Sequence, residues 1–156
     1  MTYIKAEHLK YRYPNTKKLA LDDLNFEIEK GSFIGIAGKN GAGKSTLCQA
    51  FSGLVPQFFK GAYGGTIMIG DQEASKTPVS RLCRTVGLVF QNPFNQLSGA
   101  KETVFEEIAF GLQNFGVPKE EMIQRVNEAL ELLDISAYRD RNPFDLSGGQ
   151  MQRVTL

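Results

Sequence analysis

The stretch SFIGIAGKNGAGKST, residues Ser32–Thr46, decides the fold. Its first half is apolar without alternating with polar residues, and it runs into a segment rich in glycine. A short apolar run bounded by glycines is typical of a strand that is buried on both faces of a parallel sheet. The residues that follow, Lys44–Leu54, repeat apolar side chains at helical spacing. A buried strand, a glycine-rich loop and a helix in this order predict an α/β fold.

The glycines of this stretch fit the pattern G-x-x-x-x-G-K-[ST], which is that of a phosphate-binding loop, or P-loop. A side chain at Gly38, Gly41 or Gly43 would keep phosphate oxygens away from the backbone. Without side chains, successive N–H groups can turn inward and form a nest for an anion, at which the following helix aims its positive end. A glycine-rich turn without a nucleotide is the alternative interpretation.

The polar side chains of the loop have separate expected roles. Lys44 is expected to reach the β- and γ-phosphates, the Ser45 hydroxyl to hold Mg²⁺, and Thr46 to donate to the α-phosphate side. The predicted nucleotide-binding residues of the loop are Gly38, Asn40, Gly41, Ala42, Gly43, Lys44, Ser45 and Thr46.

Strand patterns flank the loop on both sides. YIKAEHLKYRY is strand-like, and LALDDLNFEIEKG alternates well, with Leu24, Phe26 and Ile28 on one face. Such alternation is typical of an antiparallel sheet with one face in water. A further apolar strand is expected over Val86–Phe90. The first part of the chain, about residues 1–94, is therefore expected to hold a P-loop core, a mixed sheet whose N-terminal part is antiparallel.

From about residue 100 the pattern becomes helical. KETVFEEIAFGLQNFGV places Val104, Ile108, Leu112 and Phe115 at helical spacing, and PKEEMIQRVNEALELLDI opens with a proline and two glutamates, which suit a first turn. A small helical subdomain is expected over about residues 95–150. The composition, 42% hydrophobic and 22% charged, is that of an ordinary globular domain.

A second candidate anion site begins at Ser147. Ser147 and Gln150 have the spacing of a capping box, in which each side chain accepts a hydrogen bond from the other residue's backbone N–H. The intervening Gly148 and Gly149 cost roughly 1 kcal/mol each relative to alanine in a helix. A purely structural helix gains nothing from this cost, whereas a helix whose first turn lies against a phosphate gains exposed N–H groups.

LSGGQMQR resembles the signature motif of ATP-binding-cassette (ABC) ATPases, and GKNGAGKST is similar to their P-loop. The resemblance covers essentially the whole chain and implies ATP and Mg²⁺ as cofactors. It also implies a second ABC ATPase domain as partner, because two such domains pair head to tail in this family. The residues Ser147, Gly148, Gly149 and Gln150 would then bind the ATP held by the P-loop of that partner.

Two further site residues come from the same resemblance. Tyr13 resembles the aromatic residue that stacks on adenine, with Tyr11 as a close competitor and a packed core aromatic as the plain alternative. Gln91 matches the glutamine that reaches Mg²⁺ and the attacking water, although it can also be an ordinary polar residue at the end of a strand. The candidate catalytic residues are thus Lys44 and Gln91, and the candidate metal ligands Ser45 and Gln91.

FQNPFNQL, together with TVFEEIAFGLQNFGV, resembles the ATPases of energy-coupling-factor (ECF) importers, which take up vitamins or cobalt and nickel ions. This implies an ATPase subunit at the cytoplasmic face of the membrane, held there by a transmembrane coupling subunit. The net charge of +1 gives no reason to expect nucleic acid as a partner. The alternatives are a soluble ABC ATPase acting on ribosomes or chromosomes, a small-molecule P-loop kinase and a nonhydrolytic nucleotide-binding module.

The resemblance stops at Leu156. Family members continue with an apolar strand that ends in Asp and the catalytic Glu (the Walker B motif). We therefore expect an incomplete ABC ATPase domain that binds nucleotide weakly and does not hydrolyse it, because hydrolysis needs a base and an acidic residue that positions Mg²⁺. We also expect that the sheet lacks a strand and exposes an apolar edge.

Overall fold

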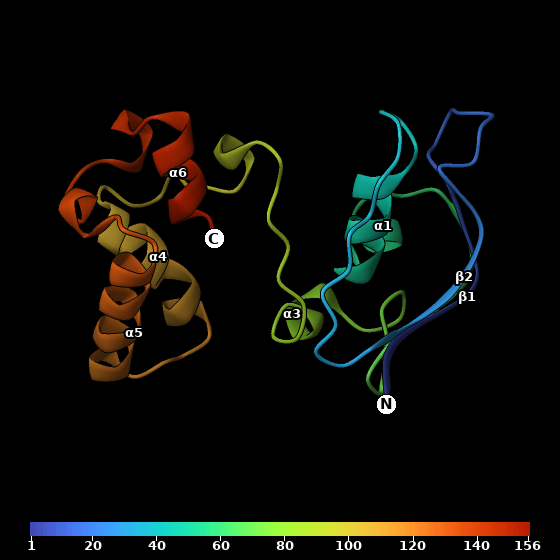
Figure 1. The fold of residues 1–156 in the computed structure, drawn as a ribbon, viewed down its shortest axis with the longest axis horizontal. Helices are drawn as coiled ribbons and strands as arrows, with labels where there is room; N and C mark the ends of the chain where they lie inside the picture. The colour runs from blue at the N-terminus through green and yellow to red at the C-terminus, as the bar shows by residue number, and fades with distance from the viewer. The chain divides into compact units, whose positions relative to one another are not determined.

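The computed structural model describes all residues from 1 to 156, and the chain divides into two units, Met1–Leu88 and Val89–Leu156 (Figure 1). Each unit has a hydrophobic core of its own. The P-loop lies in the first unit, whereas Gln91 and the signature motif lie in the second.

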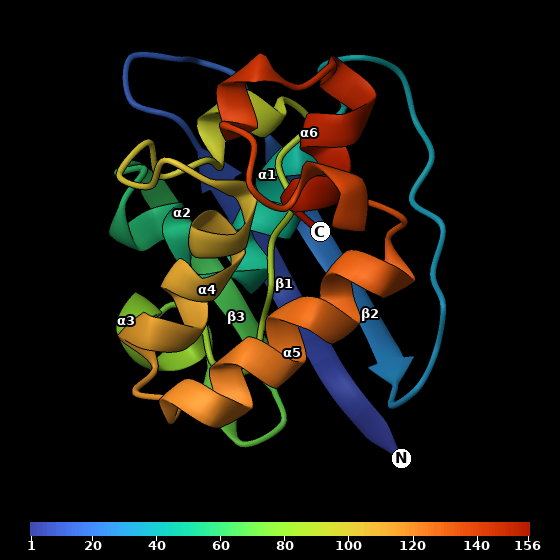
Figure 2. The ribbon, with the colours of Figure 1, turned by 90° about the vertical axis from the view of Figure 1, so that its left-hand side faces the viewer.

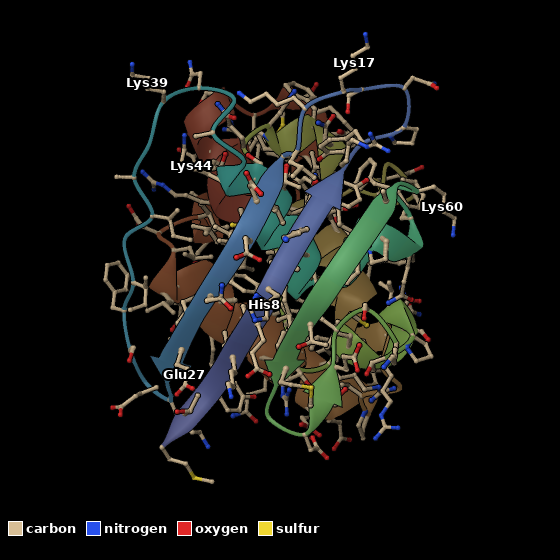
Figure 3. All side chains as sticks on the ribbon, turned by 90° about the vertical axis from the view of Figure 1, so that its right-hand side faces the viewer. His8, Lys17, Glu27, Lys39, Lys44 and Lys60 are labelled. Atoms are coloured by element: carbon tan, nitrogen blue, oxygen red, sulfur yellow. The ribbon has the colours of Figure 1, made fainter.

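The first unit is built on a four-stranded antiparallel sheet in the order β2-β1-β3-β4. The strands are β1 (Thr2–Arg12), β2 (Leu21–Glu29), β3 (Ala62–Ile69) and β4 (Gln72–Glu73). Leu24 and Phe26 of β2 pack against the core, while charged residues such as Glu27 stay exposed (Figure 3). The alternation in the sequence thus predicted the wet face of this sheet correctly, and the expected antiparallel part is confirmed.

Three helices complete the first unit, namely α1 (Lys44–Phe51), α2 (Leu54–Gln57) and α3 (Val79–Leu82). Helix α1 contributes to the core through Leu47, Ala50 and Phe51, and the Phe51 ring meets that of Phe26 edge-on at 6.1 Å between centroids. The expected helix after the P-loop is confirmed, but it ends earlier than expected. Leu54 belongs to the next short helix.

Two expected strands are absent. The segment 33–38 has no regular secondary structure, with Phe33 100%, Ile34 53% and Ile36 44% exposed, and Val86–Phe90 is not a strand either. A strand is stabilised by hydrogen bonds to a neighbouring strand, and neither segment is bonded into the sheet. An apolar run indicates a tendency to form a buried strand without supplying its partner. The expected mixed sheet is therefore represented by its antiparallel part alone.

The second unit is helical, as expected. Its α-helices are α4 (Val104–Asn114), α5 (Lys119–Leu132) and α6 (Gly148–Val154), and its short 3₁₀ helices are η1 (Pro93–Asn95), η2 (Ser136–Tyr138) and η3 (Pro143–Asp145). Figure 2 shows α4 and α5, which pack on each other. Their apolar residues and those of α6, with two residues from the segments between α5 and α6, form the core of the unit: Val104, Ala109, Val126, Leu130, Ile135, Leu146, Met151 and Val154.

Local sequence signals fix the ends of these helices. Thr103 and Glu106 form a capping box at the start of α4, and Pro118 precedes α5, whose first turn carries Glu120 and Glu121. Phe115 follows the end of α4 and is 40% exposed, so it does not extend the apolar face of that helix as the spacing predicted. None of the helices in either unit has the length and apolar character required to cross a bilayer.

Candidate nucleotide-binding site

The P-loop owes its path to two glycines with left-handed backbone conformations, Gly41 at φ 78° and Gly43 at φ 94°. A Cβ atom at Gly43 would lie 2.2 Å from the carbonyl oxygen of Ala20, just before β2, whereas one at Gly41 would meet no atom within 4 Å. Gly43 therefore lets the loop pass close to the sheet. The open space at Gly41 leaves the backbone of the loop accessible to a bulky anion.

Lys44 lies across the mouth of this loop. Its Nζ donates hydrogen bonds to the carbonyl oxygens of Gly38 (2.7 Å) and Lys39 (2.9 Å), which holds the ammonium group over the loop (Figure 3). Residues 38–42 of the loop are exposed, including Asn40 and Ala42, and the Ala42 N–H donates to the Lys39 carbonyl oxygen at 3.1 Å.

The loop ends at the N-terminus of α1. Its N-cap residue is Gly43, which offers no side-chain acceptor, so the first-turn amides of α1 are not capped by a side chain. Ser45 is exposed in this turn and Thr46 is buried. A lysine, uncapped helix amides and an exposed hydroxyl together form a donor set that suits a polyphosphate with its divalent cation.

Tyr13 is half-buried and its hydroxyl is bound to α1. It lies 3.1 Å from the Thr46 hydroxyl and donates to Gln49 Oε1 at 3.2 Å. A phenol has one proton, so when Tyr13 donates to Gln49 the Thr46 hydroxyl donates to Tyr13. If Thr46 instead donates to a phosphate, its hydrogen bond with Tyr13 is kept only when the Tyr13 hydroxyl donates to Thr46 rather than to Gln49. The structure thus connects the candidate adenine-stacking residue to the P-loop helix.

Tyr11, the competing aromatic residue, is fully buried. Its hydroxyl lies 2.9 Å from the carbonyl oxygen of Phe59 and 3.1 Å from that of Lys60, and its ring meets that of Tyr13 edge-on at 4.8 Å. Burial raises the pKa of the Tyr11 hydroxyl above its ordinary value. A side chain in this position packs the core and offers no face on which a base can stack.

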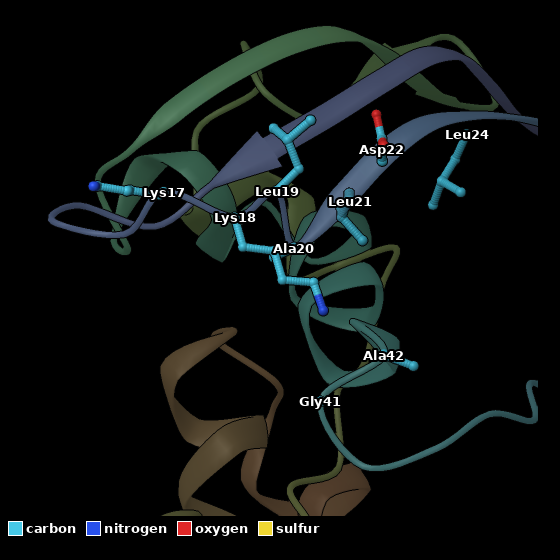
Figure 4. Close-up of a pocket in the computed structure, with 9 residues that line it drawn as sticks. All are labelled: Lys17, Lys18, Leu19, Ala20, Leu21, Asp22, Leu24, Gly41 and Ala42. Atoms are coloured by element: carbon cyan, nitrogen blue, oxygen red, sulfur yellow. The ribbon is translucent and has the colours of Figure 1, made fainter.

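A cleft of about 440 Å³ opens beside the loop (Figure 4). It lies between the segment that leads into β2 and the backbone of Gly41 and Ala42. Sequence reasoning missed Lys17, Lys18 and Asp22 in its lining. The adjacent lysines between Tyr13 and β2 were a usable signal, because cations beside a P-loop attract phosphate.

Gln91 is exposed in the second unit, between Phe90 and the cap of η1, where Asn92 accepts a hydrogen bond from the Phe94 N–H at 3.1 Å. Ser45, the other candidate ligand of Mg²⁺, belongs to the first unit. No cluster of three or more His, Cys, Asp or Glu side chains suits a metal ion in the chain.

The signature motif starts helix α6 with the expected capping box. Gln150 Oε1 accepts from the Ser147 N–H at 3.0 Å, and Ser147 Oγ accepts from the Gln150 N–H at 3.4 Å. These two bonds leave out the amides of Gly148 and Gly149. Both glycines are exposed, and a Cβ at either one would meet no atom within 4 Å. Packing within this chain therefore gives no reason for glycine at these positions.

Comparison with known proteins points to one family. The family described as "ABC transporter" matches residues 21–156. The energy-coupling factor transporter ATP-binding protein EcfA1 of Lacticaseibacillus paracasei is 46% identical over 154 residues, which are 98% of this chain and 52% of that protein. A putative ABC transporter ATP-binding protein of Pyrococcus abyssi is 40% identical over 156 residues, 100% of this chain and 55% of that protein.

Solved structures that resemble this chain belong to the same family. CbiO1 of Clostridium perfringens, described as part of the ABC transporter complex cbiONQ, matches with a TM-score of 0.79 and 34% identity over 99% of this chain and 60% of its own. The ATP-binding cassette MJ0796, in a dimeric post-hydrolysis state bound to ADP and Pi, matches with a TM-score of 0.79 and 26% identity over 97% of this chain and 66% of its own. This chain spans about half the length of the relatives in sequence. The chain belongs to the ABC transporter family.

Proposed function

We propose that this chain forms the nucleotide-binding part of an ATPase subunit that energises a membrane importer of the energy-coupling-factor type. The observation that carries the proposal is the P-loop, with the Lys44 ammonium held at its mouth and the uncapped N-terminus of α1 behind it. Among ABC ATPases, the energy-coupling-factor type is supported by the names of the relatives, which are ATP-binding proteins of ECF transporters.

In this proposal each P-loop group has a defined task. Lys44 exchanges its two carbonyl acceptors for β- and γ-phosphate oxygens, and the amides of α1 bind the same anion through the helix N-terminus. Ser45 and Gln91 are the residues that would hold Mg²⁺, which when bound neutralises charge that develops on the phosphates. Tyr13 would present its ring to adenine.

The signature motif would act on a second ABC ATPase domain. Gly148 and Gly149 are exposed, their amides take no part in the capping box, and a Cβ at either position would meet nothing in this chain, which suits contact with a triphosphate held by another domain. The dimeric state of MJ0796 among the structural neighbours supports such pairing. We further propose that residues 1–156 bind nucleotide without sustaining hydrolysis, because no carboxylate that could serve as base is among the P-loop residues, Gln91 and the signature motif.

We propose further that a transmembrane subunit holds the protein at the cytoplasmic face of the membrane, which is supported by the names of the ECF relatives and by the transporter complex to which CbiO1 belongs. The net charge of +1 disfavours a protein whose main partner is nucleic acid. A soluble ABC ATPase acting on ribosomes therefore stays the second candidate.

Calorimetric titration of the chain with ATP and Mg²⁺ tests the proposal. We expect Lys44→Ala to weaken binding at least tenfold, because a charge-assisted hydrogen bond contributes about 1.5–3 kcal/mol. Lys60→Ala, which removes an exposed lysine that follows α2, is the matched control and should bind as the parent does. Equal affinity of the Lys44→Ala and Lys60→Ala variants would exclude the P-loop as the nucleotide site.

Affinity purification of the protein at its natural length, from detergent-solubilised membranes of its own cells, distinguishes the two candidates. An integral membrane subunit that co-purifies in stoichiometric amount supports the importer. Co-purification with ribosomal particles and no membrane subunit would replace the importer by the soluble alternative.

A further inference from the structure

Gln96 bridges two distant parts of the second unit. Its Oε1 accepts a hydrogen bond from the Phe90 N–H at 3.0 Å, and its Nε2 donates to the carbonyl oxygen of Thr155 at 2.6 Å. Phe90 directly precedes Gln91, and Thr155 is the C-cap residue of α6. One partly buried side chain therefore connects the segment that carries Gln91 with the end of the signature helix.

A second connection joins the same two parts of the chain. The tripeptide Asn-Pro-Phe occurs twice, at 92–94 and at 142–144, and each asparagine caps a 3₁₀ turn by accepting from the N–H of its phenylalanine. The rings of Phe94 and Phe144 stack on each other, with centroids 6.3 Å apart and planes 29° apart. Phe144 lies shortly before Ser147, at the start of α6.

Together the two connections hold α6 at both ends. The stacked rings attach the segment after Gln91 to the turn that leads into the helix, and Gln96 attaches it to the carbonyl oxygen at the end of the helix. A primary amide suits the Gln96 position because it offers one acceptor and one donor at the same time. A carboxylate of equal length would keep the acceptor for Phe90 and would place an acceptor against Thr155.

From this arrangement we infer that Gln96 is a positioning residue that fixes the signature helix relative to the segment carrying Gln91. The inference rests on the proposed function, because the signature helix has a task only if it contacts a triphosphate. A displacement of Gln91 is transmitted to Ser147, Gly148 and Gly149 through the side chain of Gln96 and the stacked rings. Gln96 acts through these groups and contacts no nucleotide itself.

Hydrogen exchange on the protein at its natural length tests the linkage. In Gln96→Ala we expect exchange to speed up about fivefold at the Phe90 amide and in the last turn of α6, since a hydrogen bond contributes about 1 kcal/mol. In Gln96→Glu the Phe90 amide should keep its protection while the last turn of α6 loses it. Gln124→Ala, which removes an exposed glutamine of α5 that bonds Glu128 at 2.8 Å, is the matched control and should leave both regions unchanged.

ATP turnover by the same variants tests the positioning role. We expect both Gln96 variants to lower kcat about tenfold with the affinity for ATP unchanged, because the P-loop lies in the other unit. Unchanged exchange in α6, or altered exchange with an unchanged kcat, would overturn the inference. If Gln96→Ala does not fold, Gln96→Glu and Phe144→Leu, which removes the ring stack, carry the same test. Failure of the proposed function is separate, since it would appear as ATP binding that survives Lys44→Ala.

Discussion

At the scale of single residues, Gly43 meets two demands at once. Its φ of 94° lies in the left-handed region, and the Ala20 carbonyl oxygen lies where a Cβ would be placed. The left-handed conformation alone costs an alanine about 1–2 kcal/mol, and the clash with backbone adds to it. We therefore expect Gly43→Ala to lower the free energy of unfolding of the first unit by about 3 kcal/mol or more, as measured by urea denaturation.

Gly41→Ala is the control for this prediction. Gly41 has a similar φ of 78° but open space around it. The Gly41→Ala variant should therefore lower the free energy of unfolding only by the cost of the left-handed conformation, about 1–2 kcal/mol. Equal losses for the two variants would show that the close approach of the loop to Ala20 does not matter for stability.

The two tyrosines show what a sequence can and cannot tell about a candidate site. The pattern YRY offers two aromatic residues, of which Tyr13 is the candidate by resemblance to the family and Tyr11 a close competitor. The two residues differ in the structure. Tyr11 is fully buried among core residues, whereas Tyr13 is half-buried and its hydroxyl forms a hydrogen bond with the Thr46 hydroxyl of α1. The P-loop, in contrast, was located from its sequence pattern alone. Their glycine spacing is a local feature, whereas the burial of a strand residue depends on what packs on it from elsewhere in the chain.

At the scale of elements, helix α6 combines a stabilising cap with two glycines that do not stabilise it. Nothing in this chain occupies the space around Gly148 or Gly149. We therefore expect Gly148→Ala and Gly149→Ala each to stabilise the second unit, by up to about 1 kcal/mol, because alanine favours the helix. ATP-dependent pairing of domains, measured by light scattering on the protein at its natural length, should be lost in the same variants. Ser147→Ala should instead destabilise the unit by about 1 kcal/mol.

A gain in pairing upon Gly149→Ala, or a loss of stability with pairing intact, would contradict this prediction. The first result would mean that the glycine amides do not approach an anion. The second would mean that glycine is needed for the fold of α6, which the open surroundings of both residues argue against.

Helices and strands differed in how far the sequence predicted them. The helical spacing in α4, the first turn of α5 and the capping box of α6 were predicted from the sequence, because a helix is bonded to itself and capped by its neighbours in sequence. Phe33, Ile34 and Ile36 form an equally clear pattern, yet they are exposed. A strand needs a neighbouring strand that its own residues do not encode. The apolar run 33–38 therefore indicated only a tendency to form a buried strand.

At the scale of the whole molecule, the candidate site is divided between two units with separate cores. The candidate phosphate-binding groups, Tyr13 and the cleft beside Gly41 belong to the first unit. Gln91 and the signature helix belong to the second. Binding of a triphosphate by one chain should therefore stabilise one unit, and a response of the other unit requires contacts that a single P-loop does not make.

This division leads to a prediction about ligand linkage. ATP without Mg²⁺, at a hundredfold excess over its dissociation constant, should stabilise Met1–Leu88 by about 2.7 kcal/mol and leave Val89–Leu156 unchanged, at concentrations where the chain is monomeric. Mg²⁺ is left out because Gln91 of the second unit is proposed to contact the metal ion. Hydrogen exchange resolved by segment measures this, with α1 and α5 as reporters. Leu130→Ala, in the core of the second unit, should cost that unit about 2–5 kcal/mol without altering the protection of α1 by ATP. If ATP protected α5 of the parent chain as much as α1, the two units would respond to nucleotide as one body.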